Sequence, residues 1–149
     1  VITNVGPGHL EGFGSIETVR DTKLEITSYA RTVVLNVDDA MLAPVADMLR
    51  DGGRQVVTCS TRTDAAVMAR DIRFGGDRSS RLSTLSFELC VKGAGSVEVD
   101  MKISGLFNVY NALSAAAAAH VMGMSMQQIR EGLERFSGVA MRLEIREMH

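Results

Sequence analysis

The chain has 149 residues, of which 46% are hydrophobic and 23% are charged, and its formal net charge is −2. A chain of this length and composition can bury one substantial core, which excludes disorder as its main state. The near-neutral charge gives no electrostatic basis for binding nucleic acid or an anionic membrane. No apolar run approaches the roughly 20 residues needed to span a bilayer, and no signal-peptide pattern is present, so we expect a cytoplasmic location.

The first predicted element is the short apolar run of residues 1–5, which is typical of a buried strand. The glycine-rich turn Gly6-Pro7-Gly8 follows it and delivers His9. We then predict a helix that starts near Ser15 and carries Lys23. A strand, a glycine turn, a polar residue and a helix in this order place ligand-binding groups at the mouth of an open α/β sheet.

Lys23 falls within an apolar stripe of this predicted helix. The stripe consists of Ile16, Val19, Ile26 and Ala30. One interpretation is that the lysine stem packs while the ammonium reaches water. The other is that the amine is held at a site, where partial burial lowers its pKa and makes it reactive. The helix itself does not decide between the two.

Alternating strands and helices are predicted next. Residues 32–37 form a near-continuous apolar strand, typical of a parallel strand that is covered on both faces. A helix is predicted from Asp38-Asp39 to about Arg50, with the two carboxylates near its positive end, and Gly52-Gly53 ends it. Residues 55–59 are the following strand. This succession indicates βαβ units with right-handed crossovers.

The pattern then changes to alternating apolar and polar residues. The alternation covers residues 83–91 and 96–103, and the turn Lys92-Gly93-Ala94-Gly95 between them predicts an antiparallel hairpin. Residues 71–75 are a candidate third strand. We therefore predict an α/β fold, with a mostly parallel sheet flanked by helices and an antiparallel hairpin at its edge.

Two helices complete the predicted fold. The first runs from about Asn108 to Met122, and the second begins at Ser125, where Gln128 fits a capping box. Asn108 and Asn111 lie about one turn apart at the start of the first helix. An N-cap role explains one of these asparagines, whereas two neighbouring amides offer paired donors and acceptors to a planar ligand such as adenine.

The remaining polar candidates each have a simple alternative. His9 is either an ordinary hydrogen-bonded side chain or, from its place after a strand, a metal or phosphate ligand. Arg142, taken singly, is a surface arginine. Cys59 and Cys90 lack CxxC spacing and are expected to be buried free thiols. No GxxxxGKS/T loop is present, so the residues alone support an α/β domain with an anion or metal site around His9 and Lys23.

Five motifs in order resemble the ATP-dependent Mur ligase family, specifically the second half of its central, P-loop-NTPase-like ATPase domain. They are TNVGPGHLEGFGS, TKLEI, LNVDD, GLFNVYNALSAAAAA and MRLE. The wording HLEGFGS is closest to the family members that add D-Ala-D-Ala to a UDP-MurNAc tripeptide. Folylpolyglutamate and cyanophycin synthetases, and a non-catalytic nucleotide-binding relative, are the alternatives.

The resemblance implies an ATP-dependent carboxylate–amine ligase of peptidoglycan precursor synthesis, with ATP and Mg²⁺ as cofactors. In this family ATP phosphorylates a carboxylate, and an amine attacks the resulting acyl phosphate. His9 matches the magnesium-binding histidine of the family, and Lys23 matches a lysine that is carbamylated in relatives. Asn108 and Asn111 match asparagines that contact the nucleotide, and Arg142 matches an arginine near the nucleotide phosphates.

The resemblance also implies that the chain is a partial domain. The amino-terminal substrate domain, the phosphate loop and the carboxyl-terminal domain of the family would then lie outside residues 1–149. We expect these residues alone to be inactive in ligation, and we expect an exposed sheet edge to permit self-association. The implied partners are the small molecules UDP-MurNAc-peptide and D-Ala-D-Ala, and neither nucleic acid nor a membrane.

Overall fold

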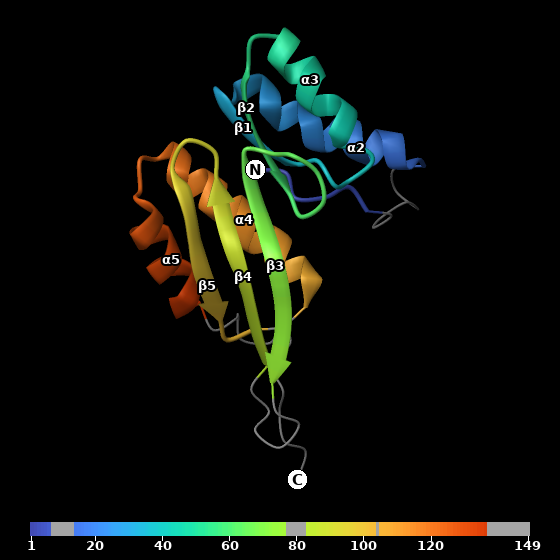
Figure 1. Ribbon diagram of the computed structural model, residues 1–149. Helices are drawn as coiled ribbons and strands as arrows, with labels where there is room; N and C mark the ends of the chain where they lie inside the picture. Colours follow the sequence, from blue (N-terminus) through green and yellow to red (C-terminus); the bar gives the residue numbers. More distant parts are fainter. Residues whose placement is uncertain (7–13, 77–82, 104, 137–149) are drawn as a thin grey trace.

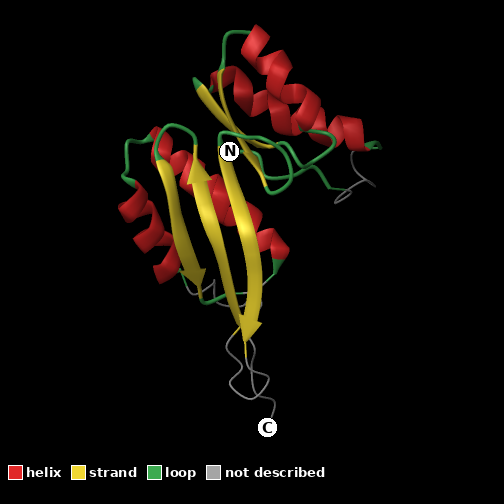
Figure 2. Ribbon diagram, viewed as in Figure 1, coloured by secondary structure: helices red, strands yellow, loops and turns green. Residues whose placement is uncertain are grey.

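The computed structural model describes residues 1–6, 14–76, 83–103 and 105–136. Five strands form one sheet, in which strands adjacent in sequence are neighbours: β1 (Thr32–Asn36), β2 (Gln55–Ser60), β3 (Val67–Gly76), β4 (Ser83–Val91) and β5 (Gly95–Met101). The α-helices are α2 (Ile16–Leu24), α3 (Ala43–Asp51), α4 (Leu106–Val121) and α5 (Met126–Arg135), and a short 3₁₀ helix, η1 (Glu25–Tyr29), follows α2 directly. Figures 1 and 2 show α2 and α3 beside β1 and β2, with α4 and α5 behind the longer strands β3–β5.

Strand β1 is covered on both faces, as its near-continuous apolar sequence predicts. Val34 belongs to a core that α4 and α5 share with β3–β5, whereas Val33 and Leu35 belong to a second core with α2 and α3. They enter different cores because successive residues of a strand point to opposite faces. All three side chains are at most 4% exposed, since both faces are covered. Strand β2 pairs with β1 in parallel, so the predicted alternation of parallel strands and helices is confirmed.

The amino-terminal segment, residues 1–6, lies beside β1 without forming a full strand. Ile2 makes one parallel bridge to Leu35, and its N–H donates to the carbonyl oxygen of Val34 at 2.9 Å. Ile2 and Val5 are both buried, which confirms the predicted burial of this run. The ladder is limited to that one bridge, and it lies along the outer side of β1. Self-association through a free sheet edge stays a prediction.

Strands β3–β5 form an antiparallel meander. Strands β4 and β5 make the predicted hairpin, which closes between Val91 and Gly95. Strand β3 extends the candidate strand at residues 71–75 in both directions. The predicted α/β class is confirmed, as a five-stranded mixed sheet with flanking helices. The apolar side chains of β4 that alternation assigned to one face are fully buried against the helices, namely Leu85, Phe87 and Leu89.

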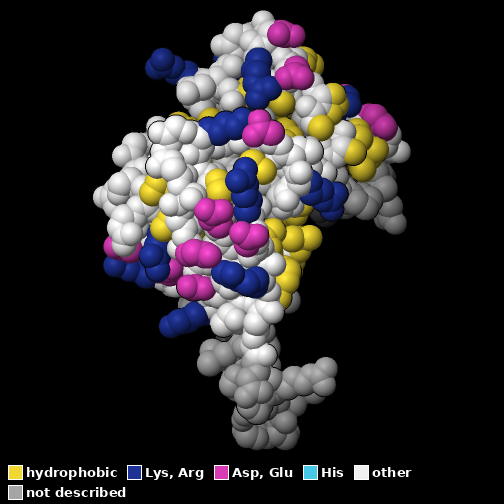
Figure 3. Space-filling model, viewed as in Figure 1, with side chains coloured by type: hydrophobic (Ala, Val, Ile, Leu, Met, Phe, Trp, Pro, Cys, Tyr) yellow, Lys and Arg dark blue, Asp and Glu magenta, His cyan; other side chains and the backbone are white. Residues whose placement is uncertain are grey.

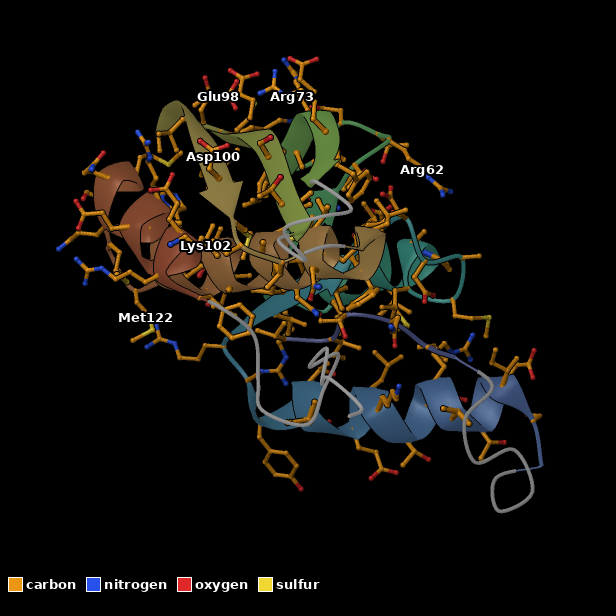
Figure 4. The ribbon with its side chains drawn as sticks, turned by 90° about the horizontal axis from the view of Figure 1, so that it is seen from below. Arg62, Arg73, Glu98, Asp100, Lys102 and Met122 are labelled. Atoms are coloured by element: carbon orange, nitrogen blue, oxygen red, sulfur yellow. The ribbon has the colours of Figure 1, made fainter. Side chains whose placement is uncertain are left out.

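The other face of the meander is polar and is turned away from α4 (Figures 3 and 4). Arg73 on β3 donates to Glu98 on β5 at 3.1 Å across the intervening strand, and Figure 4 shows both side chains on this outer face. Both side chains are more than half exposed, so the pair adds little stability. One apolar and one charged face is the pattern expected of an antiparallel sheet that meets water on one side.

Helix α2 begins where the sequence predicts, with Ser15 as N-cap accepting from the N–H of Thr18 at 3.2 Å. It ends at Leu24 and continues as η1, so the predicted apolar stripe through Ile26 is wrong. Ile26 is 64% exposed, because the tighter 3₁₀ turn rotates residues away from the α-helical stripe. Thr27 is the buried residue of η1.

Helix α3 begins at Ala43, so the prediction that it starts at Asp38-Asp39 is wrong. The two aspartates form a turn after β1. Within it, Asp39 Oδ1 accepts from the N–H groups of Met41 and Leu42 at 2.8 and 3.2 Å. An aspartate that binds its own following backbone in this way favours a turn over a helix.

Helices α4 and α5 have the end signals that the sequence indicates, with one correction. The N-cap of α4 is Gly105, which has φ 99°, so Asn108 lies inside the first turn and not at the cap. Gly123, with φ 85°, follows the end of α4. Ser125 caps α5 and the predicted capping box with Gln128 is present.

Candidate functional site

Lys23, in the last turn of α2, lies beside the segment that leads into the glycine turn. Its Nζ donates to the backbone carbonyl oxygen of Asn4 at 3.0 Å. Lys23 is exposed, so its predicted packing in an apolar stripe is wrong, and with it the interpretation of a partly buried amine. His9 lies outside the described residues, so its approach to Lys23 stays a prediction.

The second core holds Lys23 in this position. Val19 of α2 is buried in that core together with Ile2 and Val5 of residues 1–6, and Leu24 packs against it. Helix α2 and the amino-terminal segment therefore rest on the same apolar surface. The ammonium can reach Asn4 because the two elements are packed side by side, and it stays accessible to solvent.

Asn108 and Asn111 lie together near the start of α4. The Nδ2 of Asn111 donates to Oδ1 of Asn108 at 3.4 Å, as expected for side chains about one helical turn apart. Both residues line a cavity of about 330 Å³ between α4, α5 and the end of β5. The sequence therefore predicted this pair correctly as neighbours. Arg142 lies outside the described residues, so its place near the nucleotide phosphates stays a prediction.

The walls of this cavity are almost entirely apolar. They are lined by alanines along α4, by Ile129, Leu133 and Phe136 at the α5 side, and by Met101 and Ile103 from β5 and the residues after it. Alanine side chains leave room between α4 and α5, which is what the Ala-rich sequence of α4 provides. A small cavity with apolar walls and a few amide groups fits a planar, mostly apolar ligand with polar edges.

A cluster around Asp38, which sequence reasoning did not single out as a site, lies where β1 and β2 end. Its Oδ1 accepts from Ser60 Oγ at 2.5 Å. Its Oδ2 accepts from the Thr61 N–H at 2.8 Å and the Thr61 hydroxyl at 2.9 Å, and from the Tyr110 hydroxyl at 3.0 Å. Asp38 therefore connects the end of β2 to α4.

These donors decide the charge of Asp38. Partial burial raises the pKa of its carboxyl. Hydrogen bonds from Ser60, Thr61 and Tyr110 lower this pKa by more than burial raises it, so the net pKa lies below the ordinary value of 3.8. The side chain is thus a carboxylate at neutral pH. An ionised acceptor makes stronger hydrogen bonds than a neutral one.

Asp39 of the same turn and Asn36, the last residue of β1, hold the amino-terminal segment. Asp39 Oδ2 accepts from the N–H of Val5 at 2.8 Å. Asn36, which is buried, donates through Nδ2 to the carbonyl oxygen of Thr3 at 3.1 Å. The end of β1 and the turn after it, residues 36–39, therefore contact residues 1–6, β2 and α4.

A signal for this cluster was present in the sequence. The pair Asp38-Asp39 follows one buried strand, and Ser60-Thr61 ends the next. Because the carboxyl ends of neighbouring parallel strands meet at one edge of a sheet, the two polar pairs were bound to lie close together. Assigning the aspartates to a helix start hid this relationship, and Tyr110 carries no signal of its own.

The described part of the chain contains no group of three or more histidine, cysteine, aspartate and glutamate side chains that is able to hold a metal ion. Cys59 is buried, and burial raises the pKa of its thiol to about 12. Cys90 is half-buried, so only Cys59 fits the predicted buried thiol, and both are free as predicted. Among the described helices none is both long and apolar enough to cross a bilayer.

The fold and the polar cluster together define a class of protein. It is an α/β domain that gathers polar groups where its parallel strands end and has a mostly apolar cavity beside α4. The profile of the Mur ligase middle domain matches residues 1–119. The chain belongs to the Mur ligase family.

Individual relatives agree with this assignment. The chain is 30% identical over 149 residues to the UDP-N-acetylmuramate–L-alanine ligase of Syntrophus aciditrophicus, covering 98% of this chain and 29% of that protein. It is 34% identical over 150 residues to the UDP-N-acetylmuramoyl-L-alanyl-D-glutamate–2,6-diaminopimelate ligase of Halalkalibacterium halodurans, covering 97% of this chain and 29% of that protein. The chain thus spans 29% of the length of each of these relatives.

Solved structures give the same family, but the ligases that they represent differ from the two sequence relatives above. A crystal structure of MurF from Acinetobacter baumannii superposes with a TM-score of 0.83 at 26% identity, covering 98% of this chain and 31% of that chain. A pseudomurein peptide ligase type C from Methanothermus fervidus superposes with a TM-score of 0.77 at 26% identity, covering 96% of this chain and 35% of that chain. The sequence relatives and the solved structures together carry the names of several different ligases.

Proposed function

We propose that the chain is part of the middle domain of an ATP-dependent amide ligase of peptidoglycan precursor synthesis, which adds D-Ala-D-Ala to a UDP-MurNAc tripeptide. Family membership supports the ligase class. The likeness to MurF of A. baumannii and the HLEGFGS wording support this particular acceptor. Within the site, the best supporting observation is the pair of amides on the wall of an apolar cavity.

The proposed reaction has two balanced steps. A substrate carboxylate oxygen attacks the γ-phosphorus of ATP, which forms the acyl phosphate and releases ADP. The amine of D-Ala-D-Ala then attacks the acyl carbon, the C–O bond to phosphate breaks, and inorganic phosphate and a proton leave. Both steps depend on holding charged reactants in line, so binding and orientation are the main tasks of the protein.

Asn108 and Asn111 are proposed to contact the adenine ring. Apolar walls can take the faces of the base, while the two amides offer donors and acceptors to its edge. Arg142 is proposed to approach the phosphates, whose charge suits a guanidinium. The volume of the cavity, about 330 Å³, leaves room for a nucleobase, and its apolar walls and amides support this proposal.

The fit to Mg²⁺ depends on a change at Lys23. An ammonium is a donor, and Mg²⁺ takes oxygen ligands. We propose that Lys23 is carbamylated in the working enzyme, which gives it carboxylate oxygens, and that His9 and this group hold the ion. Bound there, Mg²⁺ would neutralise phosphate charge. The proximity of Lys23 to Asn4 supports the idea, because the backbone runs from Asn4 toward His9.

Two other functions compete with this proposal. Another Mur-type ligase, including a folylpolyglutamate or cyanophycin synthetase, would use the same ATP chemistry on other substrates. The names of the relatives, which include an L-alanine-adding and a diaminopimelate-adding ligase, keep this option open. A non-catalytic relative that retains the domain as a scaffold is the candidate from another class.

The test uses the full-length protein that contains this chain. We would incubate it with ATP, Mg²⁺ and UDP-MurNAc tripeptide, offer D-Ala-D-Ala, L-alanine, D-glutamate or diaminopimelate, and measure phosphate release and product mass. UDP-MurNAc tripeptide is the carboxylate substrate for D-Ala-D-Ala. For each other amine it is replaced by the UDP-MurNAc substrate to which the corresponding ligase adds that amine. Product with D-Ala-D-Ala alone supports the proposal. Product with another amine, or addition of an amino acid to folate or to cyanophycin in parallel assays, supports another ligase. No product with any of these substrates supports the scaffold.

The partial-domain proposal has its own tests. Upstream coding sequence with a GxxGKS/T loop supports the enzyme, and a degraded loop supports the scaffold. Residues 1–149 alone should release no phosphate with the substrates that the full-length protein uses. A cytoplasmic location goes with the proposal, because the reaction consumes ATP.

A further inference from the structure

We infer that Asp38 and Asp39 are positioning residues, which fix the nucleotide-contacting end of α4 relative to the amino-terminal segment that leads to His9. The inference rests on the proposed function for the identity of these two sites. The juxtaposition itself is structural. The turn after β1 holds both elements through the adjacent carboxylates of Asp38 and Asp39.

The first half of the connection runs to α4. The Tyr110 hydroxyl donates to Asp38 Oδ2 at 3.0 Å and lies 3.0 Å from the Thr61 hydroxyl oxygen. Tyr110 lies between Asn108 and Asn111 in the sequence. Because a helix is rigid over a single turn, fixing Tyr110 also fixes the direction in which these two asparagines leave the helix.

The second half runs to the amino-terminal segment. Asp39 Oδ2 accepts from the N–H of Val5 at 2.8 Å, while its Oδ1 accepts from the N–H groups of Met41 and Leu42. Lys23 binds the carbonyl oxygen of the preceding residue, Asn4. The backbone before His9 is therefore held on one side by Asp39 and on the other by Lys23.

Adjacent carboxylates make the connection short. From Val5 to Tyr110 the path crosses two hydrogen bonds, the side chains of Asp39 and Asp38, and the peptide unit that joins these two residues. The planar peptide cannot stretch, and Asp38 is held as a carboxylate by several donors. We therefore expect a displacement of Tyr110 on α4 to shift residue 5, and this matters where reacting groups must meet within a fraction of an ångström.

The experiment uses the full-length ligase with three substitutions, Tyr110→Phe, Asp38→Asn and Asp39→Asn. Each removes one connection and preserves side-chain shape. The matched controls are Tyr29→Phe, at a tyrosine that is 92% exposed, and Asp64→Asn, at an exposed aspartate paired with Lys92 at 2.6 Å. For each protein the KM for ATP, the kcat and the thermal unfolding midpoint are measured.

We expect Tyr110→Phe and Asp38→Asn to raise the KM for ATP by roughly threefold to tenfold, the scale of one ordinary lost hydrogen bond. The kcat should fall less than the KM rises, and the controls should match wild type in all three quantities. A merely structural role would lower the unfolding midpoint and the active fraction, which leaves the KM unchanged. An unchanged KM in both variants overturns the inference.

Amide hydrogen exchange supplies a readout that does not need catalysis. In Tyr110→Phe the N–H of Val5 should exchange faster than in wild type, because Tyr110 is connected to Val5 through the two aspartates. Unchanged exchange at Val5 in this variant overturns the coupling, even if the KM rises. If the wild-type protein makes no amide product, the proposed function fails, and exchange at Val5 alone decides whether the turn connects the two elements.

Discussion

The Nζ of Lys23 lies 3.0 Å from the carbonyl oxygen of Asn4, in the segment that leads to His9. The contact has a chemical consequence for the proposed carbamate. A carbamylated lysine keeps one N–H, so it can still donate to Asn4 while its two new oxygens point elsewhere. The Asn4 carbonyl would therefore orient the modified side chain, and the ammonium form marks the position from which the carbamate oxygens extend.

Substitution of Lys23 by arginine should abolish most ligase activity in the full-length protein. Arginine keeps the positive charge and the donor to Asn4, but its guanidinium does not form a carbamate. We expect kcat to fall about 100-fold or more, as for the loss of a charge-neutralising group at a phosphoryl-transfer site. Lys102→Arg, at an exposed lysine near the end of β5, is the control. Wild-type turnover should also increase with added bicarbonate, and near-normal activity in Lys23→Arg would refute the carbamate.

Substitution of Asn111 by alanine should weaken nucleotide binding. The change removes an amide from the cavity wall and leaves Asn108 without the bond that Asn111 donates to it. The KM for ATP should rise by about tenfold, the effect of losing one or two polar contacts. Gln127→Ala is the matched control, because Gln127 is an exposed amide on α5 that binds Glu131 at 2.9 Å. Equal KM values for the two variants would remove Asn111 from the nucleotide site.

Acid stability should depend on Asp38. Burial raises the pKa of its carboxyl, but the surrounding hydrogen-bond donors lower this pKa by a larger amount, so the net pKa lies below 3.8. Because the folded pKa lies below the unfolded one, the carboxylate stabilises the protein above the unfolded pKa, and this is lost as the pH falls through the folded pKa. From about pH 5 to 2 the free energy of unfolding should fall more steeply for wild type than for Asp38→Asn. Urea titrations across this range measure the slopes, and Asp64→Asn should keep the wild-type slope.

The core under the meander should be sensitive to a lost ring at Phe87. This side chain is 0% exposed and packs in the core shared by β3–β5, α4 and α5. Phe87→Ala should lower the free energy of unfolding by about 3–5 kcal/mol, from lost burial and the cavity left behind. Phe74→Ala, at a phenylalanine of β3 that is 53% exposed, should cost much less. Equal losses in urea unfolding would contradict the described core.

The cap of α5 gives a smaller effect that tests local geometry. Ser125 Oγ accepts from the N–H of Gln128, whose side chain accepts from the Ser125 N–H at 2.9 Å. Ser125→Ala should lower the free energy of unfolding by about 1 kcal/mol. Ser125→Gly should lower the free energy of unfolding by only about a few tenths of a kcal/mol, because glycine is also a favourable N-cap. Chemical denaturation compares the two, and a larger loss for glycine would contradict the cap.

The strands were the most predictable part of this fold. Residues 32–37 and 55–59 are rich in apolar and β-branched side chains, residues 83–91 alternate between apolar and polar, and each range corresponds to a strand. The start of α3 was not predictable from its charges alone. Aspartates near a helix amino terminus and aspartates in a turn have the same sequence signature, and the contacts of Asp39 with Met41 and Val5 decide between them.

The candidate site was predictable where its residues share one element. Asn108 and Asn111 are neighbours because helical spacing makes them so. The surroundings of Lys23 were not predictable, since they depend on where α2 gives way to a 3₁₀ turn and on how residues 1–6 pack beside it. Tyr110 was missed because its value comes from a partner, Asp38, that is distant in sequence.

Strands β2 and β3 are joined by only two residue pairs, Cys59 with Val67 and Ser60 with Met68. Helix α4 packs against β1 and β2 on one side of this narrow junction and against β3 and β4 on the other. Few backbone hydrogen bonds therefore join the two halves of the sheet at its centre, and the packing of α4 across this junction holds the halves together. A bend or an insertion in this single helix would strain both halves of the molecule at once, whereas the same change in a surface loop would strain neither.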